Sequence, residues 1–556
     1  MSFIKGCQII DGPMMVNVII TWAKKHTKRL LFLKVDIEKA FDSLSWSFLI
    51  SIMGQVGFSI KWRNWICALA SVLVNGSLTK EFKLEKGLCQ GDPLSPFLFI
   101  LALEAFGVAI LEDKINISHL QFADDALILG DWSMANAKNL SRILTCFHLA
   151  SGLKVNFNKS KLFGIGVTDN EINIVASSND CIASYFLCLY LGLPIGARMS
   201  RCINWIPLVE RFQKQLSKWK VNSLSFGGRL TLNKSVLGSL GVYYFSTFKS
   251  PKKSINKLEG IRRRFFENGG LGIGSLMESN QSLLAKWWWR FCVEKKIIWR
   301  KVIRSIHGPT SGMLNPFDLK QSSGTWSQIV NLKDYLNFIK INLPLLFKKK
   351  IGNGKSTRFW HDNWLGGKTL REAFMLLYQL ETKKDCYVFE RHGSVLQNSH
   401  TSHGSIQVLG PISQPIISRI NDGLVTPWAW RRRPYSLAQI LELTDLQNLL
   451  TDLHLSMDQD SWEFTQGSMR IFSVNSMRKT ISNTSVDPTS QQTRWNKLLP
   501  SKVNILAWCI ANKRLLTKAN LDKRWIDLDL VLCPMCNNDI EMESHILVSC
   551  PTAQAM

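Results

Sequence analysis

Three aspartates at the ends of apolar runs constrain this chain more than any other feature. Asp36 ends the run Leu31–Val35, and the adjacent pair Asp124 and Asp125 interrupts an alternating apolar stretch, residues 118–129. A carboxylate at the tip of a buried strand is costly to desolvate unless a cation neutralises it. Mg²⁺ prefers oxygen ligands and keeps water and substrate phosphates in its remaining positions. We therefore expect paired strands whose ends hold a divalent metal.

The segments around the aspartates predict their own secondary structure. Ser45 precedes apolar residues at helical spacing, and Gly57 stands where a left-handed residue ends such a helix. The two-Asp centre of residues 118–129 predicts a tight hairpin with the acids at its tip. A second helix follows, and it ends before Gly152. Taken alone, each aspartate is more typical of a helix cap or a turn, but together with these surroundings they favour a metal site.

Charge and composition indicate a polyanionic partner. The 556 residues include 68 Lys and Arg against 42 Asp and Glu, a formal net charge of +26, which favours nucleic acid. Hydrophobic residues at 46% and 20 Trp indicate globular domains, roughly three or four of ~150 residues each. No apolar stretch reaches the length of a membrane span, and the N-terminus lacks a signal-peptide pattern. The 13 cysteines fit reduced thiols, so an intracellular location in the nucleus or cytoplasm is expected.

Three motifs resemble those of one protein family. Residues 34–42 (KVDIEKAFD), 86–96 (KGLCQGDPLSP) and 122–125 (FADD) are similar in order, spacing and chemistry to motifs A, B and C of reverse transcriptases from plant LINE-type, non-LTR retrotransposons. The likeness continues in three further segments, which are residues 151–160 (motif D), 190–196 (primer grip) and 224–229. On this resemblance the chain is identified as a member of that family, truncated at its N-terminus.

The resemblance implies an α+β fold, the right-hand polymerase, with an antiparallel palm sheet backed by helices, a helical thumb, a helical connector and a small zinc-binding C-terminal domain. We expect residues 1–197 to form the palm with partial fingers and residues 198–300 a thumb-like helical region. Residues 301–460 would be the connector, with a linker near 382–415, and residues 461–556 the zinc-binding domain.

The family also implies catalytic roles for matching residues. Asp36 and Asp124 would ligate two Mg²⁺ ions, and Asp125 would be a weaker ligand or a support. Lys159 would donate a proton to the leaving pyrophosphate. On local sequence alone, Lys159 is equally typical of a solvated surface charge.

Four further residues match positions that bind substrate. Ile37 would add a backbone carbonyl to the metal site, and Phe41 would pack under the sugar and exclude a 2′-hydroxyl. Gln90 and Gly91 would hold the incoming nucleotide and the template, although Gly91 is also typical of an ordinary turn. The implied partners are an RNA template, a DNA primer and dNTPs. The sequence predicts no membrane partner and leaves the oligomeric state open.

A second metal site is predicted near the C-terminus. Cys533, Cys536, His545 and Cys550 have the spacing C-x2-C-x8-H-x4-C, and three thiolates with one imidazole suit a single structural Zn²⁺. Incidental reduced cysteines beside an exposed histidine are the alternative. The preceding residues 495–508 resemble the zinc-binding domain that follows reverse transcriptase in the same elements, and nucleic-acid contact is its expected role.

Three cationic triplets lie beside aromatic residues: Arg262–Arg264, Lys348–Lys350 and Arg431–Arg433. Such clusters can grip phosphates while the aromatics stack on bases, and solvated surface charge is the alternative. Residues 351–360 superficially suggest a phosphate loop but lack the Walker spacing. Trp287–Trp289 are expected in the core, because consecutive helical residues point in different directions.

Departures from the family pattern bear on activity. Cys7 and Cys89 stand where the family usually has arginine, and most of the fingers, an endonuclease domain and an RNase H domain are expected to be missing. Because positioning supplies a large share of a phosphoryl-transfer rate, we expect an RNA-directed DNA polymerase that is weak or inactive. The alternative is a non-catalytic nucleic-acid-binding remnant that acts through its basic surface and zinc module. A DNA-templated polymerase or a nucleotide cyclase is disfavoured by the zinc motif and by residues 122–125.

Overall fold

A computed structural model of the chain describes residues 6–555 except for several internal segments. Those segments are residues 68, 113–117, 123–124, 186–187, 216–231, 233–234, 237, 267–273, 309–310, 314–323, 392–427, 452, 468, 486–497, 512–514 and 524–527. Asp124 and the family-like residues 224–229 therefore lie outside the described residues.

The chain divides into two compact units. The first comprises Met1–Trp205, Val242–Pro251 and Met277–Thr484, and the second comprises Ile206–Gly241, Lys252–Leu276 and Ser485–Met556. The limits of these units do not coincide with the domain boundaries predicted at residues 197, 300 and 460. Those domain boundaries stay a prediction.

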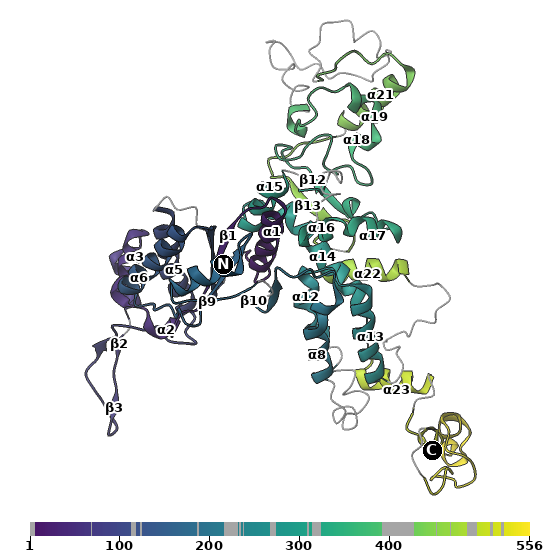
Figure 1. The fold of residues 1–556 in the computed structure, drawn as a ribbon. Coiled ribbons are helices and arrows are strands. Elements are labelled where there is room, and N and C mark those ends of the chain that lie inside the picture. Colours follow the sequence, from purple (N-terminus) through teal and green to yellow (C-terminus); the bar gives the residue numbers. More distant parts are fainter. Residues whose placement is uncertain are drawn as a thin grey trace. The chain divides into compact units, whose positions relative to one another are not determined.

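An antiparallel sheet forms the centre of the first unit (Figure 1). Its strands lie in the order β6 (Ser118–Phe122), β7 (Asp125–Asp131), β1 (Leu30–Val35), β8 (Lys161–Ile165) and β9 (Ile182–Ala183). All neighbours are antiparallel except β8 and β9, which are parallel. The apolar run before Asp36 is thus the central strand, paired on both sides.

Both faces of this sheet are covered by helices, as the alternating side chains of its strands require. Phe32 and Leu127 join the core that contains α1 (Asp11–Lys25). Leu33 faces the opposite way, into a core with α6 (Met134–Ser151) and α7 (Asp169–Ser177). The predicted α+β class, an antiparallel sheet backed by helices, is confirmed.

The predicted helix boundaries near the aspartates are also confirmed. Ser45 caps α3 (Trp46–Gln55) by accepting a hydrogen bond from the Phe48 N–H, and Gly57 follows the helix with φ +96°. Gly152 follows α6 with φ +80°, and a Cβ there would lie 2.4 Å from the Ser43 carbonyl oxygen. Only glycine fits this close approach, which fixes α6 against the segment that follows Asp36.

Further elements complete the N-terminal part of the first unit. They are α2 (Ala40–Ser43), α4 (Ile60–Ile66), β2 (Leu69–Ala70), β3 (Leu73–Val74), β4 (Ser77–Leu78), β5 (Phe82–Lys83), α5 (Ser95–Glu112), β10 (Cys188–Tyr190), β11 (Leu193–Ile195) and η1 (Cys202–Trp205). Helices α3 and α5 share a separate core with Trp46, Leu49 and Phe99.

The rest of the first unit is mostly helical. Its elements are α12 (Val242–Thr247), α14 (Leu276–Val293), α15 (Ile298–His307), α16 (Thr325–Val330), α17 (Leu332–Phe338), η4 (Leu343–Leu346), β12 (Phe347–Lys350), α18 (Leu370–Ala373), α19 (Met375–Leu380), α21 (Leu437–Thr451), β13 (Ser461–Phe464) and α22 (Val474–Ser485). Trp287 and Trp288 are buried in the core shared with α1, and Trp289 packs against it, so the predicted core position of these tryptophans is confirmed.

The predicted linker near 382–415 is wrong over its first ten residues. Cys386 and Val388 are buried in a core with Phe359 and Trp360. Arg391 forms a buried ion pair with Glu381, with 2.9 Å between Nη2 and Oε2. Polar composition suggested a linker, but these contacts make residues 382–391 folded chain. The remainder of the predicted linker lies outside the described residues.

The second unit contains α8 (Ile206–Gln215), α11 (Gly238–Leu240), α13 (Lys252–Phe266), α23 (Ser501–Ala511), α24 (Lys518–Asp522), the π-helical turn η7 (His545–Ser549) and α25 (Pro551–Gln554). Leu208 and Phe212, four positions apart on α8, are buried. Over the part of the chain that the structure describes, every helix is too short or too polar to cross a bilayer.

Candidate active site and metal centre

The ends of three strands meet at one edge of the sheet. Val35 of β1 pairs with Ala126 of β7, so the continued register places Asp36 opposite Asp125. On the other side, Lys34 pairs with Lys161 of β8, and the Asp36 carbonyl accepts from the Asn156 N–H, so the turn that contains Lys159 lies between these two contacts. The sheet therefore brings Asp36 and Asp125 to neighbouring positions beside this turn.

Strands β6 and β7 pair as an antiparallel hairpin, as predicted. The pairing runs up to Phe122 and Asp125. Residues 123–124 lie outside the described residues, so the predicted place of Asp124 at the tip and next to Asp36 stays a prediction.

Hydrogen bonds hold the backbone of Asp36 in place. Its N–H donates to the Ser160 hydroxyl at 3.1 Å, and its carbonyl accepts from the Asn156 N–H at 2.8 Å. The Ser160 hydroxyl in turn donates to the Asn156 carbonyl at 2.8 Å, and Ile37 forms a bridge with Val155. The Asp36 side chain itself is exposed. The site thus has a fixed backbone and an accessible carboxylate.

Ser160 is a positioning residue that sequence reasoning missed. The turn Asn156–Ser160 was singled out only for Lys159, whose N–H donates to the Asn156 side-chain oxygen at 3.1 Å. Ser160 is fully buried next to an exposed turn. No local sequence signal identifies this bond, because the burial of Ser160 and its partner depend on the pairing of β1 with β8.

Asp125 has a cationic neighbour that the sequence did not reveal. Its Oδ1 lies 3.3 Å from the Nζ of Lys34, which stands two residues before Asp36 on β1. Burial, together with the negative charge of Asp125, raises the pKa of Tyr243 to about 12. Because Lys34 compensates the charge of Asp125, the geometry fits the supporting role expected for this aspartate.

The segment after Asp36 is held against the loop that contains Gln90 and Gly91. The Phe41 carbonyl accepts from the Leu88 N–H at 2.7 Å, and the Phe41 ring stacks on Phe99 of α5 with centroids 4.7 Å apart. Gln90 and Gly91 are exposed, and a Cβ added at Gly91, where φ is +95°, would have no neighbouring atom within 4 Å. The loop therefore keeps open space beside its backbone.

The start of α5 explains why this loop turns where it does. The carboxylate of Asp92 accepts from the Leu94 N–H at 3.2 Å and from the Ser95 hydroxyl at 3.3 Å. These bonds satisfy donors at the helix N-terminus, as capping side chains do. The turn interpretation of Gly91 and Asp92 is thus correct locally, and it leaves Gln90 exposed.

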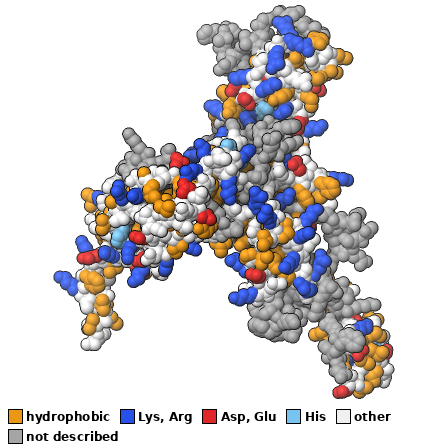
Figure 2. Space-filling view, viewed as in Figure 1, with side chains coloured by type: hydrophobic (Ala, Val, Ile, Leu, Met, Phe, Trp, Pro, Cys, Tyr) orange, Lys and Arg blue, Asp and Glu red, His pale blue; other side chains and the backbone are white. Residues whose placement is uncertain are grey.

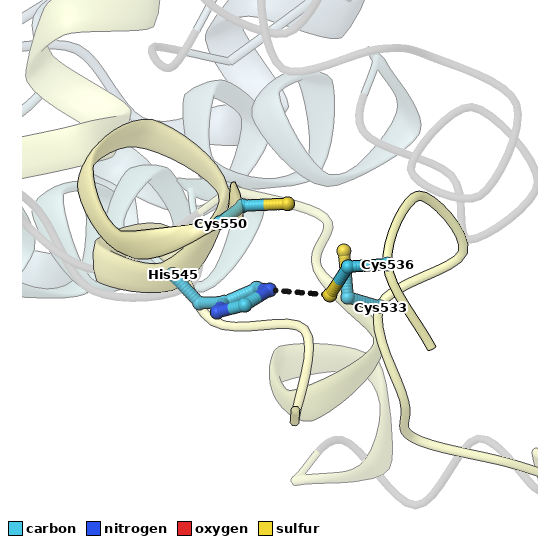
Figure 3. A group of neighbouring side chains, drawn as sticks. All are labelled: Cys533, Cys536, His545 and Cys550. Carbon is cyan, nitrogen blue, oxygen red and sulfur yellow. Dashed lines mark hydrogen bonds between the residues drawn. The ribbon is translucent and has the colours of Figure 1, made fainter. Parts of the chain in front are cut away.

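The predicted zinc ligands converge (Figure 3). One ligand atom from each of Cys533, Cys536, His545 and Cys550 lies within 4.8 Å of the others, and the Cys536 Sγ lies 3.1 Å from the His545 Nε2. Cys533, His545 and Cys550 are buried. Three sulfurs and one imidazole nitrogen at this spacing fit a tetrahedral zinc site.

Local backbone bonds shape this cluster. The Cys533 N–H donates to the Asp539 carbonyl at 2.8 Å, and the Cys550 N–H donates to the His545 carbonyl at 2.7 Å. The Nδ1 of His545 lies 3.5 Å from the Asp539 carboxylate. A carboxylate at the far nitrogen of a metal-binding histidine orients the ring, and this neighbour was also missed from the sequence.

Two family models match the parts of the chain that contain these residues. Residues 1–216 match the family model described as reverse transcriptase (RNA-dependent DNA polymerase), and residues 472–556 match the model described as zinc-binding in reverse transcriptase.

Relatives cover the chain unevenly. A putative ribonuclease H protein of Arabidopsis thaliana is 25% identical over 381 residues, 62% of this chain and 54% of that protein. A Pol polyprotein from the type-1 retrotransposable element R2 of Popillia japonica is 29% identical over 198 residues, 32% of this chain and 26% of that protein. The chain thus spans about half of the first relative and about a quarter of the second.

Among solved structures, a telomerase from Candida tropicalis in complex with a telomeric RNA fragment is 14% identical, with a TM-score of 0.26, over 53% of this chain and 52% of that one. A TM-score this low supports no inference about the chain.

Proposed function

The chain belongs to the reverse transcriptases of non-LTR retrotransposons, and on that premise we propose that residues 1–216 act as an RNA-directed DNA polymerase whose two Mg²⁺ ions are held by Asp36 and Asp124. The observation that carries the proposal is the register of β1 and β7, which brings the position after Val35 opposite Asp125 at one edge of the sheet. The exposed carboxylate of Asp36 at this edge is the ligand type that Mg²⁺ prefers.

The residues of the chain would divide the work as follows. Bound Mg²⁺ would activate the primer hydroxyl and neutralise the triphosphate. Ser160 fixes the backbone of Asp36, and Lys34 balances the charge of Asp125. Lys159, in the turn that follows Asn156, whose N–H donates to the Asp36 carbonyl, would donate a proton to the leaving pyrophosphate.

Substrate selection would depend on residues around the opening. The carbonyl of Ile37 would contribute one more oxygen at the metal site. Phe41, held by its stacking on Phe99, would limit the space at the sugar C2′ and so select dNTPs. Gln90 and Gly91 would contact the incoming nucleotide and the template, since their loop is exposed and open.

Structural zinc is the second part of the proposal. Cys533, Cys536, His545 and Cys550 would hold one Zn²⁺, which would stabilise a C-terminal segment with few buried apolar residues.

Primer extension tests the polymerase proposal. Wild-type chain with an RNA template, a DNA primer, Mg²⁺ and dNTPs should extend the primer slowly, as expected of a chain with partial fingers. Asp36→Asn and Asp124→Asn should each reduce this rate by about 10²–10³-fold or more. Asp131→Asn is the matched control, because Asp131 is an exposed aspartate at the opposite end of β7. Equal loss in the control, or synthesis that survives Asp124→Asn, would refute the assignment.

The net charge of +26 favours one second candidate, an RNA-binding protein without polymerase activity. Lysine and arginine side chains are spread widely over the face shown in Figure 2. This candidate predicts salt-dependent RNA binding that Asp36→Asn leaves unchanged, together with no primer extension by the wild-type chain under any metal condition.

A further inference from the structure

Helix α15 and the residues just before it concentrate positive charge without any acid of their own. Residues 295–307 contain five lysines and arginines and no aspartate or glutamate. Aspartate and glutamate are not scarce in the chain, which has 42 of them against 68 Lys and Arg. The five cations, here called the α15 patch, are Lys295, Lys296, Arg300, Lys301 and Arg304.

Packing against α1 uses the apolar side of α15 (Figure 1). Trp299 and Ile303 are fully buried in the core that contains α1. Val302 and Ile306 are partly buried and pack against the same core. The apolar stripe of this amphipathic helix is therefore already covered by the chain itself.

The opposite side of α15 presents only cations at neighbouring positions. Arg300 and Lys301 lie four and three positions before Arg304, and side chains at these spacings are neighbours on a helix surface, with about 5–6 Å between Cβ atoms. Lys301 and Arg304 are exposed, and Arg300 is half-buried. The helix thus holds three positive charges side by side at the surface.

No acid neutralises the patch in the part of the chain that the structure describes. None of the ion pairs between described residues includes a member of the patch. Glu294, the acid just before the patch, accepts instead from the Arg290 Nε at 2.8 Å and from the Trp299 indole N–H at 2.9 Å. The cations of the patch are left to repel one another.

Arg300 is the member whose charge costs most. Its guanidinium lies over the Phe291 ring, 4.7 Å from the ring centroid, and its Nη1 donates to the Lys295 carbonyl at 3.4 Å. Its Nε is buried and has no hydrogen-bond partner among the described residues. Burial and the charge of Arg304 lower the pKa of Arg300. Arginine nevertheless stays protonated, so this half-buried guanidinium would be stabilised by an anion.

We propose that the α15 patch binds the sugar-phosphate backbone of a nucleic-acid strand, without reading its base sequence. A strand presents phosphates at regular intervals, and neighbouring cations on one helix face can contact several of them and release their counterions. A guanidinium donates two parallel N–H groups to one phosphate. The inference rests on the nucleic-acid partner of the proposed function and not on synthesis by the chain.

A membrane surface fits this helix less well. Basic helices that lie on membranes insert their apolar side into the lipid, whereas α15 buries that side in the protein. Ile298, at the first position of the helix, is 51% exposed. One such side chain supplies little of the apolar area that insertion requires.

Binding of a labelled single-stranded RNA to the full chain, measured by fluorescence anisotropy at several salt concentrations, tests the proposal. Arg300→Gln with Arg304→Gln should weaken binding about tenfold. It should also reduce the slope of log K against log salt by about 1.4, because each phosphate contact to a single strand contributes about 0.7. Lys301→Gln with Arg304→Gln changes only exposed side chains and should have a similar effect without disturbing the fold.

Helix α6 offers a matched control. Lys138 and Arg142 lie four positions apart on α6 and are exposed, and they too have no ion pair with any residue that the structure describes. Helix α6 packs on the face of the sheet opposite to α1. Lys138→Gln with Arg142→Gln removes the same charge and should leave the affinity and the salt slope close to the wild-type values.

The assay separates this site from the polymerase proposal. It contains no dNTPs, so it measures binding alone. Asp36→Asn, which should abolish primer extension, should bind the RNA as tightly as the wild type does. Loss of RNA binding in the α15 variants with an active wild-type polymerase, or the reverse, would therefore distinguish the two proposals.

Three outcomes would overturn the proposal. Both α15 variants could leave the affinity and the salt slope unchanged, or the α6 control could reduce them as much. Alternatively, the α15 variants could weaken binding to vesicles of phosphatidylcholine and phosphatidylserine, or to a polyglutamate peptide, while RNA binding is unchanged. These last results would assign the patch to a membrane or to an acidic protein.

Discussion

Asp460 is enclosed by the loop that superficially suggested a phosphate site, and this arrangement makes a sharp prediction. The Asp460 carboxylate accepts from the N–H groups of Gly352 and Gly354 at 2.8 Å and of Ser356 at 2.9 Å. It also accepts from the hydroxyls of Ser356 at 3.1 Å and Thr357 at 2.8 Å. The backbone donors that would bind a phosphate are therefore taken by a carboxylate of the same chain.

The size of the effect follows from the pKa of Asp460. Burial opposes ionisation, but the hydrogen bonds from Gly352 and Ser356 outweigh it and lower the pKa from 3.8 to about 2. That shift corresponds to roughly 2.5 kcal/mol, and solvent screening of this partly exposed group reduces it to about 1–1.5 kcal/mol. Asp460→Asn also places an amide donor against the Ser356 and Thr357 donors, so the total cost should be about 2 kcal/mol.

Hydrogen exchange of the loop amides measures the free energy of opening the loop itself. A local measurement is needed because a chain with two units need not unfold in two states. In Asp460→Asn the amides of Gly352, Gly354 and Ser356 should exchange about 30-fold faster than in the wild type at neutral pH. Asp458→Asn is the control, since Asp458 is exposed two residues away.

The pH dependence has a defined sign. A depressed pKa stabilises the folded loop fully above the unfolded value near 3.8 and loses this stabilisation as the pH falls through about 2. The difference between wild type and Asp460→Asn should therefore be constant above pH ~5 and narrow below pH ~4. Equal exchange in the two proteins at neutral pH, or a difference that widens on acidification, would refute the reasoning.

Three further predictions follow from other contacts. Arg290→Leu leaves the buried Asp11 carboxylate without the guanidinium that it contacts at 2.7 and 3.0 Å. The free energy of unfolding, measured by denaturant titration, should therefore fall by about 3–5 kcal/mol, and Asp11→Asn in the same chain should recover part of this loss. Phe41→Ala should admit ribonucleotides in the primer-extension assay, and unchanged discrimination would remove Phe41 from the sugar site. Cys536→Ser, or removal of zinc with a chelator, should lower the bound zinc from one equivalent to near zero. The rate of hydrogen exchange should then rise in residues 528–555 alone. Full retention of zinc in Cys536→Ser would contradict the ligand assignment.

Local signals predicted much of the sheet edge. The strand before Asp36, the pairing of β6 with β7, the cap at Ser45 and the glycine after α6 each depend on residues close together in sequence. Short-range periodicity, caps and turns determine such features, so one sequence is enough to predict them. The family-like motifs then predicted which strand ends carry chemistry.

Contacts between distant segments were not predictable in the same way. The hydrogen bond from Asp36 to Ser160 spans 124 positions, and the ion pair of Lys34 with Asp125 depends on the strand order. No local pattern specifies a partner across a sheet, because register fixes it only once both strands are paired. The same limit applies to Asp539 beside His545, where spacing predicted the ligands but not their neighbour.

The cationic triplets show how burial changes the meaning of charge. Lys349 is buried on β12 and lies 3.1 Å from the Asp362 carboxylate, whereas Lys350 is exposed. Arg262 is buried and contacts Glu259, with Arg263 exposed beside it. Successive residues of a strand face opposite sides, so Lys349 shares the buried side of β12 with Phe347, although its acidic partner could not be named from the sequence. A phosphate backbone can therefore meet only the outward members of these triplets, and substitution of Lys349 should reduce stability while substitution of Lys350 should reduce the salt dependence of RNA binding.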